Sequence, residues 1–536
     1  MDTCLPQTVS ALAPRCAAAL LAAAIACLPA PVQTQTLRWA ARADAESMDP
    51  HTLAETQTMG MAMLVHDALV ERDRQLAIVP ALAVRWQALT PTRWRFELRR
   101  GVRFHDGTPL TADDVVFSVL RAQQPTSQLS FYAQPLGTPV KLDDHTVELR
   151  QAQVNPLLLQ HLAQVAIMSR SWTEAHRAGR VPDYQAREEA HTTRHAMGTG
   201  RFVLKERQPG LRTVYERHPD WWGQAAGNVQ RIVFTPVAND ATRTAALVAG
   251  DVDFVNDLPV QDAERVRGTP GLQVVEAPEN RLILLGFNQG DVGPQPGAAA
   301  AANPFRDRRV REAFALAIDT EVLRTTVMRG MAAPTRCMAV AAPGCMAPAL
   351  EAPRRADPGR ARQLMAEAGY AHGFALAMDC PNDRYLRDQA LCLALVGMLS
   401  RIGVQLRIDA RPKSTWLPRI QSGRSSAFLF GWAGAFADAQ PLLDPVVHSA
   451  GTVPGKGGSN FARVSDPVVD DLIDAAGAEA DPARRATLIG AAQQRIADEA
   501  LYLPLHRQTL LWAARDGLAF TTTPNGVVRP DWMHLR

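Results

Sequence analysis

The chain has 536 residues, with 57 Lys or Arg against 54 Asp or Glu, so its formal net charge is +3. This length is enough for about three domains, and the ordinary content of apolar and charged residues excludes global disorder. The nearly balanced charge argues against nucleic acid as a partner.

The N-terminal residues 1–35 predict a secretory signal peptide. Arg15 precedes an apolar run from Ala17 to Leu28, and small residues and Pro follow it. A membrane-spanning helix needs about 20 apolar residues, and this run is shorter. A loose match to the lipoprotein processing box leaves a lipid anchor on Cys27 as an alternative. Either processing route predicts export to the periplasm.

Strand and helix patterns alternate along the rest of the chain, which predicts a mixed α/β fold. Apolar and polar residues alternate over 94–99, as in a half-buried strand. Thr111 opens a helix, and Asp114 completes a capping box three residues later. Another helix is expected to end at Gly250. Further strands are expected at 37–41, 146–149, 202–205, 282–287, 404–408, 502–505 and 510–513, further helices at 310–318, 360–367, 390–402 and 466–499, and a flexible loop at 290–302.

Four cysteines follow the predicted leader, and an even number in an oxidising compartment allows two disulfides. Proximity along the chain suggests the pairs Cys337–Cys345 and Cys380–Cys392. Free buried thiols are the alternative. A zinc site is disfavoured because no pair of these cysteines has CxxC spacing.

Sequence templates for catalysis fail in this chain. Residues 451–456 are one residue short of a phosphate-binding loop, and Gly457 stands where Ser or Thr is required. His191 and His195 are four residues apart, but no acid lies between them, so a solvated helix face is preferred to a zinc protease site. We therefore predict no catalytic residues, no metal site and no cofactor.

A long segment carries a specific family resemblance. Residues 79–118 include the run Trp-Arg-Phe-Glu-Leu-Arg-Arg-Gly at 94–101 and the run Phe-His-Asp-Gly-Thr-Pro-Leu-Thr-Ala-Asp-Asp-Val at 104–115. Together with shorter motifs, this segment resembles the dipeptide/oligopeptide-binding proteins, the family 5 extracellular solute-binding proteins of ABC importers. The shorter motifs lie, in order, at 198–200, 216–223, 250–253, 285–288, 309–311, 315–319, 368–370 and 402–404.

The resemblance implies a fold like that of the type II periplasmic binding proteins of class C. Two lobes would be joined by a hinge, and the ligand would bind between them. Lobe I would comprise residues 36–80, 195–288 and 506–536. An extra subdomain would comprise 81–194, and lobe II would comprise 289–505.

The resemblance also suggests a carboxylate-binding residue. Family members that bind dipeptides carry an Arg after a strand of lobe II, and Arg384 is the nearest match. A guanidinium grips a carboxylate through two parallel hydrogen bonds. A structural salt bridge of Arg384 is the alternative.

The segment 428–435 resembles the strand and loop that contribute the amine-binding site of the family. Peptide-binding members place an Asp where this chain has Ala435. A buried ammonium without a carboxylate partner is costly, so this departure puts ordinary peptide recognition in doubt. Asp438 is a substitute if the loop re-aims it. Trp432 and Phe436 are candidates for a stacking surface, or for core residues.

Five further polar residues are expected to face the ligand by the same resemblance. Thr56, Gln57 and Thr58 follow the first strand, and Asn288 and Gln289 lie where the chain first crosses between lobes. A capping or turn role is the alternative for each.

The expected function is capture of a peptide or peptide-like solute and its delivery to the permease subunits of an ABC importer, by a monomer that is not an enzyme. The alternatives are a non-peptide solute, such as an opine, a glutathione-like molecule, a sugar or a metal chelate, and a chemosensory ligand-binding subunit.

Overall fold

The computed structural model describes residues 1, 3, 35–224, 226–294, 303–451 and 455–536. The predicted cleavage region and Cys27 lie outside the described residues, as does most of the predicted loop at 290–302. Within the described part of the chain, no helix is long and apolar enough to cross a membrane.

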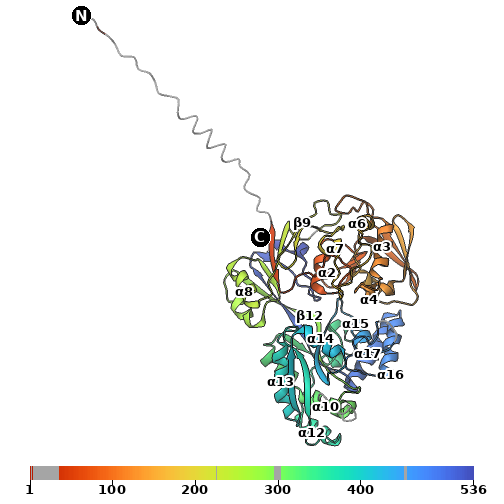
Figure 1. Cartoon of the computed structure of the whole chain (residues 1–536), viewed down its shortest axis with the longest axis vertical. Helices are drawn as coiled ribbons and strands as arrows, with labels where there is room; N and C mark the ends of the chain where they lie inside the picture. The colour runs from red at the N-terminus through yellow and green to blue at the C-terminus, as the bar shows by residue number, and fades with distance from the viewer. Residues whose placement is uncertain (2, 4–34, 225, 295–302, 452–454) are drawn as a thin grey trace.

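The chain folds into two parts that are stacked in Figure 1, with strand β12 running from one to the other. The upper part in that view is formed by the N-terminal half and the C-terminal end of the chain. Its elements outside the extra subdomain are β1 Thr36–Ala41, α2 Thr56–Ala62, β2 Val70–Arg72, β3 Ile78–Pro80, β8 Phe202–Gln208, β9 Arg212–Arg217, β10 Arg231–Pro236, α8 Asp240–Ala249, β11 Phe254–Asn256, α9 Ala263–Arg267, β18 Leu518–Ala519 and β19 His534–Leu535.

The predicted extra subdomain has its own antiparallel sheet, with strand order β4-β5-β7-β6. Its buried apolar residues form a separate cluster that includes Phe96, Phe104 and Leu149. The elements are β4 Ala83–Thr90, β5 Arg93–Leu98, α3 Ala112–Ala122, α4 Ser130–Ala133, β6 Thr138–Asp143, β7 Thr146–Arg150, α5 Leu158–Leu162, α6 Arg170–Ala175 and α7 His191–Arg194.

The lower part in Figure 1 is lobe II, which has one large apolar core between its sheet and its helices. Helices α13 and α10 contribute Leu391 and Phe314 to that core. The elements are α10 Arg308–Ala317, α11 Thr320–Val322, β13 Ala332–Pro334, α12 Pro358–Glu367, β14 Ala375–Pro381, α13 Asp388–Ser400, β15 Gln405–Arg411, α14 Lys413–Gln421, β16 Ala427–Ala433, α15 Gln440–Leu442, α16 Pro467–Ala478 and α17 Pro482–Asp498.

Two long antiparallel strands connect the lobes. They are β12 (Leu272–Phe287) and β17 (Leu503–Arg515), and they join the strands of both lobes into one sheet of order β15-β14-β16-β12-β17-β11-β1-β10-β9-β8. Their pairing register shifts between Pro278 and Leu282. A bulge bends a strand and interrupts its ladder, so this position is suited to act as a hinge.

The mixed α/β architecture with two lobes confirms the fold predicted from the resemblance. The domain boundaries themselves stay a prediction. Their support is the separation of the apolar cores, although the core of lobe II already begins at Leu282, within β12. The chain therefore crosses from one lobe to the other within β12 and β17, and not at the ends of these strands.

Both predicted disulfides are present. Cys337 pairs with Cys345, and Cys380 pairs with Cys392. The second bond ties the end of β14 to helix α13. The free-thiol alternative is excluded for these four residues.

Local signals in the sequence also place helix ends correctly. Thr111 precedes α3, and the Asp114 carboxylate accepts hydrogen bonds from the Thr111 backbone N–H and hydroxyl. Gly250 ends α8 in the left-handed conformation, with φ of 84°. One local prediction is wrong. Thr56, Gln57 and Thr58 were expected in a loop after the first strand, but they lie in helix α2.

Candidate functional site

Phe436, in the loop after β16, brings lobe II into contact with the other part of the molecule. The guanidinium carbon of Arg72 lies 5.2 Å from the centre of the Phe436 ring, and the ring of His161 lies 6.2 Å from it. Phe436 is 3% exposed. The predicted aromatic surface therefore includes a residue at the boundary between the lobes.

Trp432, by contrast, belongs mainly to lobe II. Its indole N–H donates to the carbonyl of Pro441 at 2.9 Å, and its ring packs against the core of lobe II beside Phe430. It is half-buried, so one side of the ring still faces outward. The packing supports the core role of Trp432, and its role as a stacking surface for a ligand stays a prediction.

Asp438 does not replace the missing acid at Ala435. Its two carboxylate oxygens accept hydrogen bonds from Arg485 at 2.7 and 2.9 Å, and one of them also accepts from the backbone N–H of Gln440. Asp438 thus holds the loop onto α17 within lobe II. The carbonyl of Ala435 instead accepts a hydrogen bond from Asn525, which belongs to the C-terminal segment.

Arg384 is exposed on lobe II. Its guanidinium lies 5.7 Å from the ring centre of Tyr385, and its backbone N–H donates to Asp388. The structural salt bridge that was its alternative role is absent among the described residues. The Arg384 side chain hydrogen-bonds to the Tyr385 hydroxyl, and its exposed guanidinium has further donors that a ligand could use.

Lys413, at the start of α14, lies in the same charged region as Arg384. Burial, followed by the neighbouring Arg384, lowers the pKa of Lys413, whereas Glu55, Asp383 and Glu46 act in the opposite direction. Glu46 and Glu55 belong to the other part of the molecule. The charges of Glu46 and Glu55 thus act on Lys413 across the boundary, and this mixture of charges suits a ligand with both signs of charge.

The three predicted ligand-facing residues of α2, Thr56, Gln57 and Thr58, differ in whether they have local hydrogen bonds. Thr58 is 1% exposed, its backbone N–H donates to Glu55, and its hydroxyl accepts from the N–H of Glu46. Thr56 and Gln57 are half-buried and stay candidates. Hydrogen bonds of Thr58 therefore hold Glu46 and Glu55 next to helix α2.

The structure contradicts the prediction that Asn288 and Gln289 face the ligand. Asn288 is 0% exposed, and its amide donates to the carbonyls of Gly423 and Ser425. Gln289 donates to the carbonyl of Leu501. Both fasten loops inside lobe II and do not face the boundary, because β12 passes into the lobe II core before it ends.

Sequence reasoning missed a polar group next to Phe436, formed by Arg72, Tyr132 and His161. Burial lowers the pKa of Arg72 to about 10 and raises that of Tyr132 to about 12. Burial first, and then Arg72, lower the pKa of His161 to about 4. No local signal marked these residues, since Arg72 sits in a run of charges that is typical of a surface turn.

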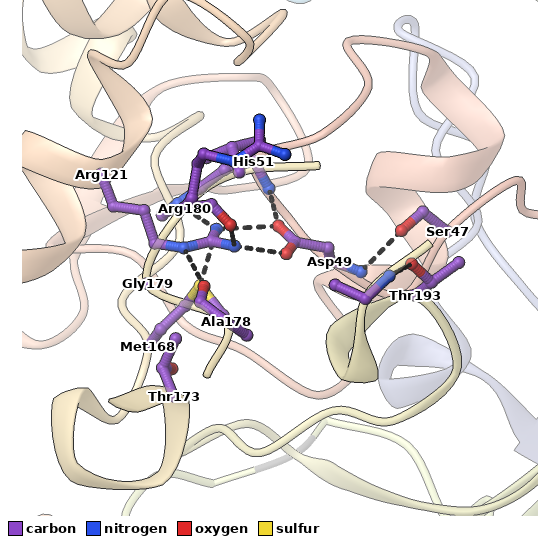
Figure 2. A network of polar contacts seen from close by, with 12 residues as sticks. Ser47, Asp49, His51, Arg121, Met168, Thr173, Ala178, Gly179, Arg180 and Thr193 are labelled. Carbon is purple, nitrogen blue, oxygen red and sulfur yellow. Dashed lines mark hydrogen bonds and ion pairs between the residues drawn. The ribbon is translucent and has the colours of Figure 1, made fainter. Parts of the chain in front are cut away.

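A buried ion pair connects the loop between β1 and α2 to helix α3. Asp49 and Arg121 are 0% and 1% exposed at their side chains, and Figure 2 shows the carboxylate facing the guanidinium, with His51 beside them. The two hydrogen bonds measure 2.9 and 2.6 Å. Although burial opposes it, Arg121 holds the pKa of Asp49 below its usual range. The pair joins lobe I to helix α3 of the extra subdomain.

The described residues offer one group of three side chains with metal-ligating atoms, Cys337, Cys345 and Glu351. The two sulfurs are bonded to each other, and Glu351 is paired with Arg507. This group is therefore structural.

Comparison with known proteins places the chain in a family. The family model of bacterial extracellular solute-binding proteins, family 5 Middle, matches residues 77–453, more than half of the chain. The chain is 25% identical over 479 residues to the heme-binding protein A of Haemophilus influenzae, covering 82% of this chain and 81% of that protein. It is 24% identical over 477 residues to a glutathione-binding protein of Shigella flexneri, covering 87% and 88%.

Solved structures show the same fold. An ABC transporter-associated periplasmic binding protein of Helicobacter pylori in complex with the peptide STSA superposes with a TM-score of 0.77 at 21% identity, covering 93% of this chain and 98% of that one. An agropinic acid complex of a periplasmic binding protein from Agrobacterium tumefaciens gives 0.75 at 21% identity, covering 94% and 99%. The two-lobed architecture, its crossing strands and the family match agree: this chain belongs to the bacterial extracellular solute-binding proteins of family 5.

Proposed function

We propose that this chain captures a peptide or a peptide-like acid between its two lobes in the periplasm and delivers it to the permease of an ABC importer. The observation that carries this proposal is the charge arrangement at the lobe boundary. Arg384 and Lys413 are available on lobe II, and Glu46 and Glu55 lie on the opposite side. A solute with a carboxylate and an amine would satisfy both sides.

The mechanism needs binding and closure but no bond cleavage. The solute would first contact one lobe, and rotation about the register shift in β12 would bring the other lobe onto it. Because the closed form alone places both sets of charges against the solute, the solute would stabilise that form. The permease would then recognise the closed form.

The relatives support a small acidic solute as the ligand. Their names and complexes include glutathione, heme, peptides and an opine, and each of these carries at least one carboxylate. We therefore favour a peptide-like acid over a sugar.

The test is calorimetry on the purified mature protein with four probes: reduced glutathione, the dipeptide Met-Leu, agropinic acid and heme. We expect one of the first three to bind with a Kd of about micromolar or tighter, which corresponds to about −8 kcal/mol. The bound probe should be recovered chemically intact. Failure of all four to bind, or recovery of a cleaved probe, would contradict the proposal.

A further inference from the structure

Arg72 is a half-buried cation at the boundary between the lobes. Its Nε donates to the side-chain oxygen of Gln160 at 2.8 Å, and its Nη2 donates to the Gln160 carbonyl at 2.6 Å. Among the described residues no Asp or Glu forms an ion pair with it, and Nη1 has no acceptor. A guanidinium in such surroundings is costly unless a counter-charge is supplied.

Three buried arginines of the chain show how the protein stabilises a guanidinium away from solvent. Arg121 pairs with Asp49, and Arg201 pairs with Glu71 and Asp531. Arg311 lacks an acid within hydrogen-bonding distance, but its guanidinium donates to four backbone carbonyls. Arg72 differs from all three, because one end of its guanidinium is left without a partner in the described structure.

His161 presents a second unused donor. Its Nδ1 lies 3.2 Å from the amide nitrogen of Asn155, and the orientation of that amide is set because its oxygen accepts from the N–H of Leu157. Nδ1 must therefore be the acceptor, so the proton of the neutral ring is on Nε2. Within the described residues, Nε2 has no acceptor.

Tyr132 adds a third donor. Its ring centre lies 5.8 Å from that of His161, and its hydroxyl has no partner in the part of the chain that is described. Arg72, Tyr132 and His161 come from β2, α4 and α5, so three elements contribute residues to this group. All three residues keep part of their surface open.

The group lies at the lobe boundary, opposite Phe436. Arg72 and His161 both contact that ring, and Figure 1 shows α4 at the edge of the upper part next to α15 of lobe II. Asp438 is the nearby acid of lobe II, but Arg485 already engages both of its oxygens. Within the described residues, no carboxylate accepts a hydrogen bond from Arg72, Tyr132 or His161.

We propose that Arg72, Tyr132 and His161 form a carboxylate-binding subsite that the acid group of the solute occupies when the lobes close. The planar guanidinium matches a carboxylate, and the phenol and the imidazole N–H can donate to the remaining lone pairs. The aromatic rings beside them favour an apolar group attached to the acid. The subsite rests on the proposed function and adds Arg72 as the residue that selects the acid.

The test uses benzoate as the probe and neutral benzamide as its isosteric control. Binding to the full mature protein is measured by saturation-transfer NMR and by the shift in Tm. Arg72→Gln should weaken benzoate binding by about tenfold or more, and benzamide should bind neither protein detectably. Arg74→Gln is the matched control, because Arg74 is exposed two residues away and lies over the ring of Trp532.

Stability separates a binding role from a structural one. Arg72→Gln also loses the two hydrogen bonds to Gln160, so a lower Tm of the ligand-free variant measures that structural role. The binding role is measured by the rise in Tm that benzoate causes in each protein. Equal benzoate affinity of wild type and Arg72→Gln overturns the subsite, as does a lack of benzoate binding to the wild type. If Arg72→Gln does not fold, Tyr132→Phe must weaken benzoate binding by several-fold.

The two proposals fail separately. If a peptide-like probe binds wild type and Arg72→Gln equally, the subsite is wrong and the proposed function stands. If benzoate binding depends on Arg72 but no peptide-like probe binds, the proposed solute class is wrong and the subsite stands.

Discussion

Single residues at the lobe boundary differ mainly in whether a partner already occupies them. Asp438 is committed to Arg485, and Asn288 to backbone carbonyls, although both were expected to face the ligand. Arg384 and Arg72 are left with free donors. A side chain is available for a ligand only when the fold does not use it, and one-dimensional motifs carry no information on that.

The departure at Ala435 gives a prediction on ligand choice. Ala435→Asp should improve the affinity for the free-amine dipeptide Met-Leu, because the new carboxylate would pair with the ammonium. Calorimetry with Met-Leu and with its N-acetylated form checks this, and the acetylated form should gain nothing. Tight binding of Met-Leu to the unmutated protein would show that the family's acid is not needed here.

The buried pair of Asp49 and Arg121 gives a prediction on stability. Asp49→Asn leaves Arg121 buried without a counter-charge and should lower the free energy of unfolding by about 3 kcal/mol. Asp113→Asn is the control, because its ion pair with Lys141 is exposed and is expected to contribute less than about 1 kcal/mol. Urea unfolding followed by tryptophan fluorescence measures both. Equal losses would refute the assignment of Asp49 and Arg121 as a critical pair.

At the scale of elements, periodicity and end signals predicted several of the helices and strands. The capping box at Thr111 and the Gly250 end of α8 are local, so neighbouring residues suffice to specify them. Helix α2 escaped prediction because it is short and rich in Thr and Gly, and its N-cap is Glu55. Packing of Met61 and Ala62 in the lobe I interior stabilises it where propensity does not.

The disulfide between β14 and α13 gives a prediction at this scale. It closes a loop with a sequence separation of 12, for which the chain-entropy model gives about 3 kcal/mol. Cys380→Ser combined with Cys392→Ser should lower the free energy of unfolding by about this amount. Mass spectrometry after alkylation checks the pairing: without reduction, Cys337, Cys345, Cys380 and Cys392 should stay unlabelled. Labelling of the unreduced protein would show that the bonds are absent.

At the scale of the whole molecule, both lobes share one sheet through β12 and β17. A motion of one lobe must therefore pass through these strands, and the register shift after Pro278 is the natural place for it. Glu279 and Arg281 form an ion pair of 2.8 Å at this shift, and Gln508 of β17 donates to the same carboxylate. This polar contact couples the two crossing strands.

Buried histidines give a prediction on acid stability. Burial lowers the pKa of His506, which is 3% exposed, to about 4. A folded pKa below the unfolded value of about 6.5 means that the unfolded state binds the proton first, so the stability from neutral His506 is complete above pH 6.5 and is lost as the pH falls toward 4. At pH 5.5 the loss should be about 1.4 kcal/mol.

Asp444, whose pKa burial raises to about 6, acts in the opposite direction. The measurement is therefore the difference in unfolding free energy between wild type and His506→Gln at pH 7.5 and at pH 5.5. The difference should shift by about 1.4 kcal/mol in favour of the variant at the lower pH. A difference that does not change with pH would mean that His506 is not buried in its neutral form.

The sequence by itself determined the family, the α/β class and the ends of several helices, and it suggested the disulfide pairs that the structure contains. These follow from motifs and spacings that act over a few neighbouring residues. Only the tertiary structure decided which side chains meet between the lobes. Arg72, Tyr132 and His161 are far apart in the chain, and their free donors become visible only when packing shows which partners are absent. Burial and pairing are properties of the folded surroundings, so they had to come from the fold.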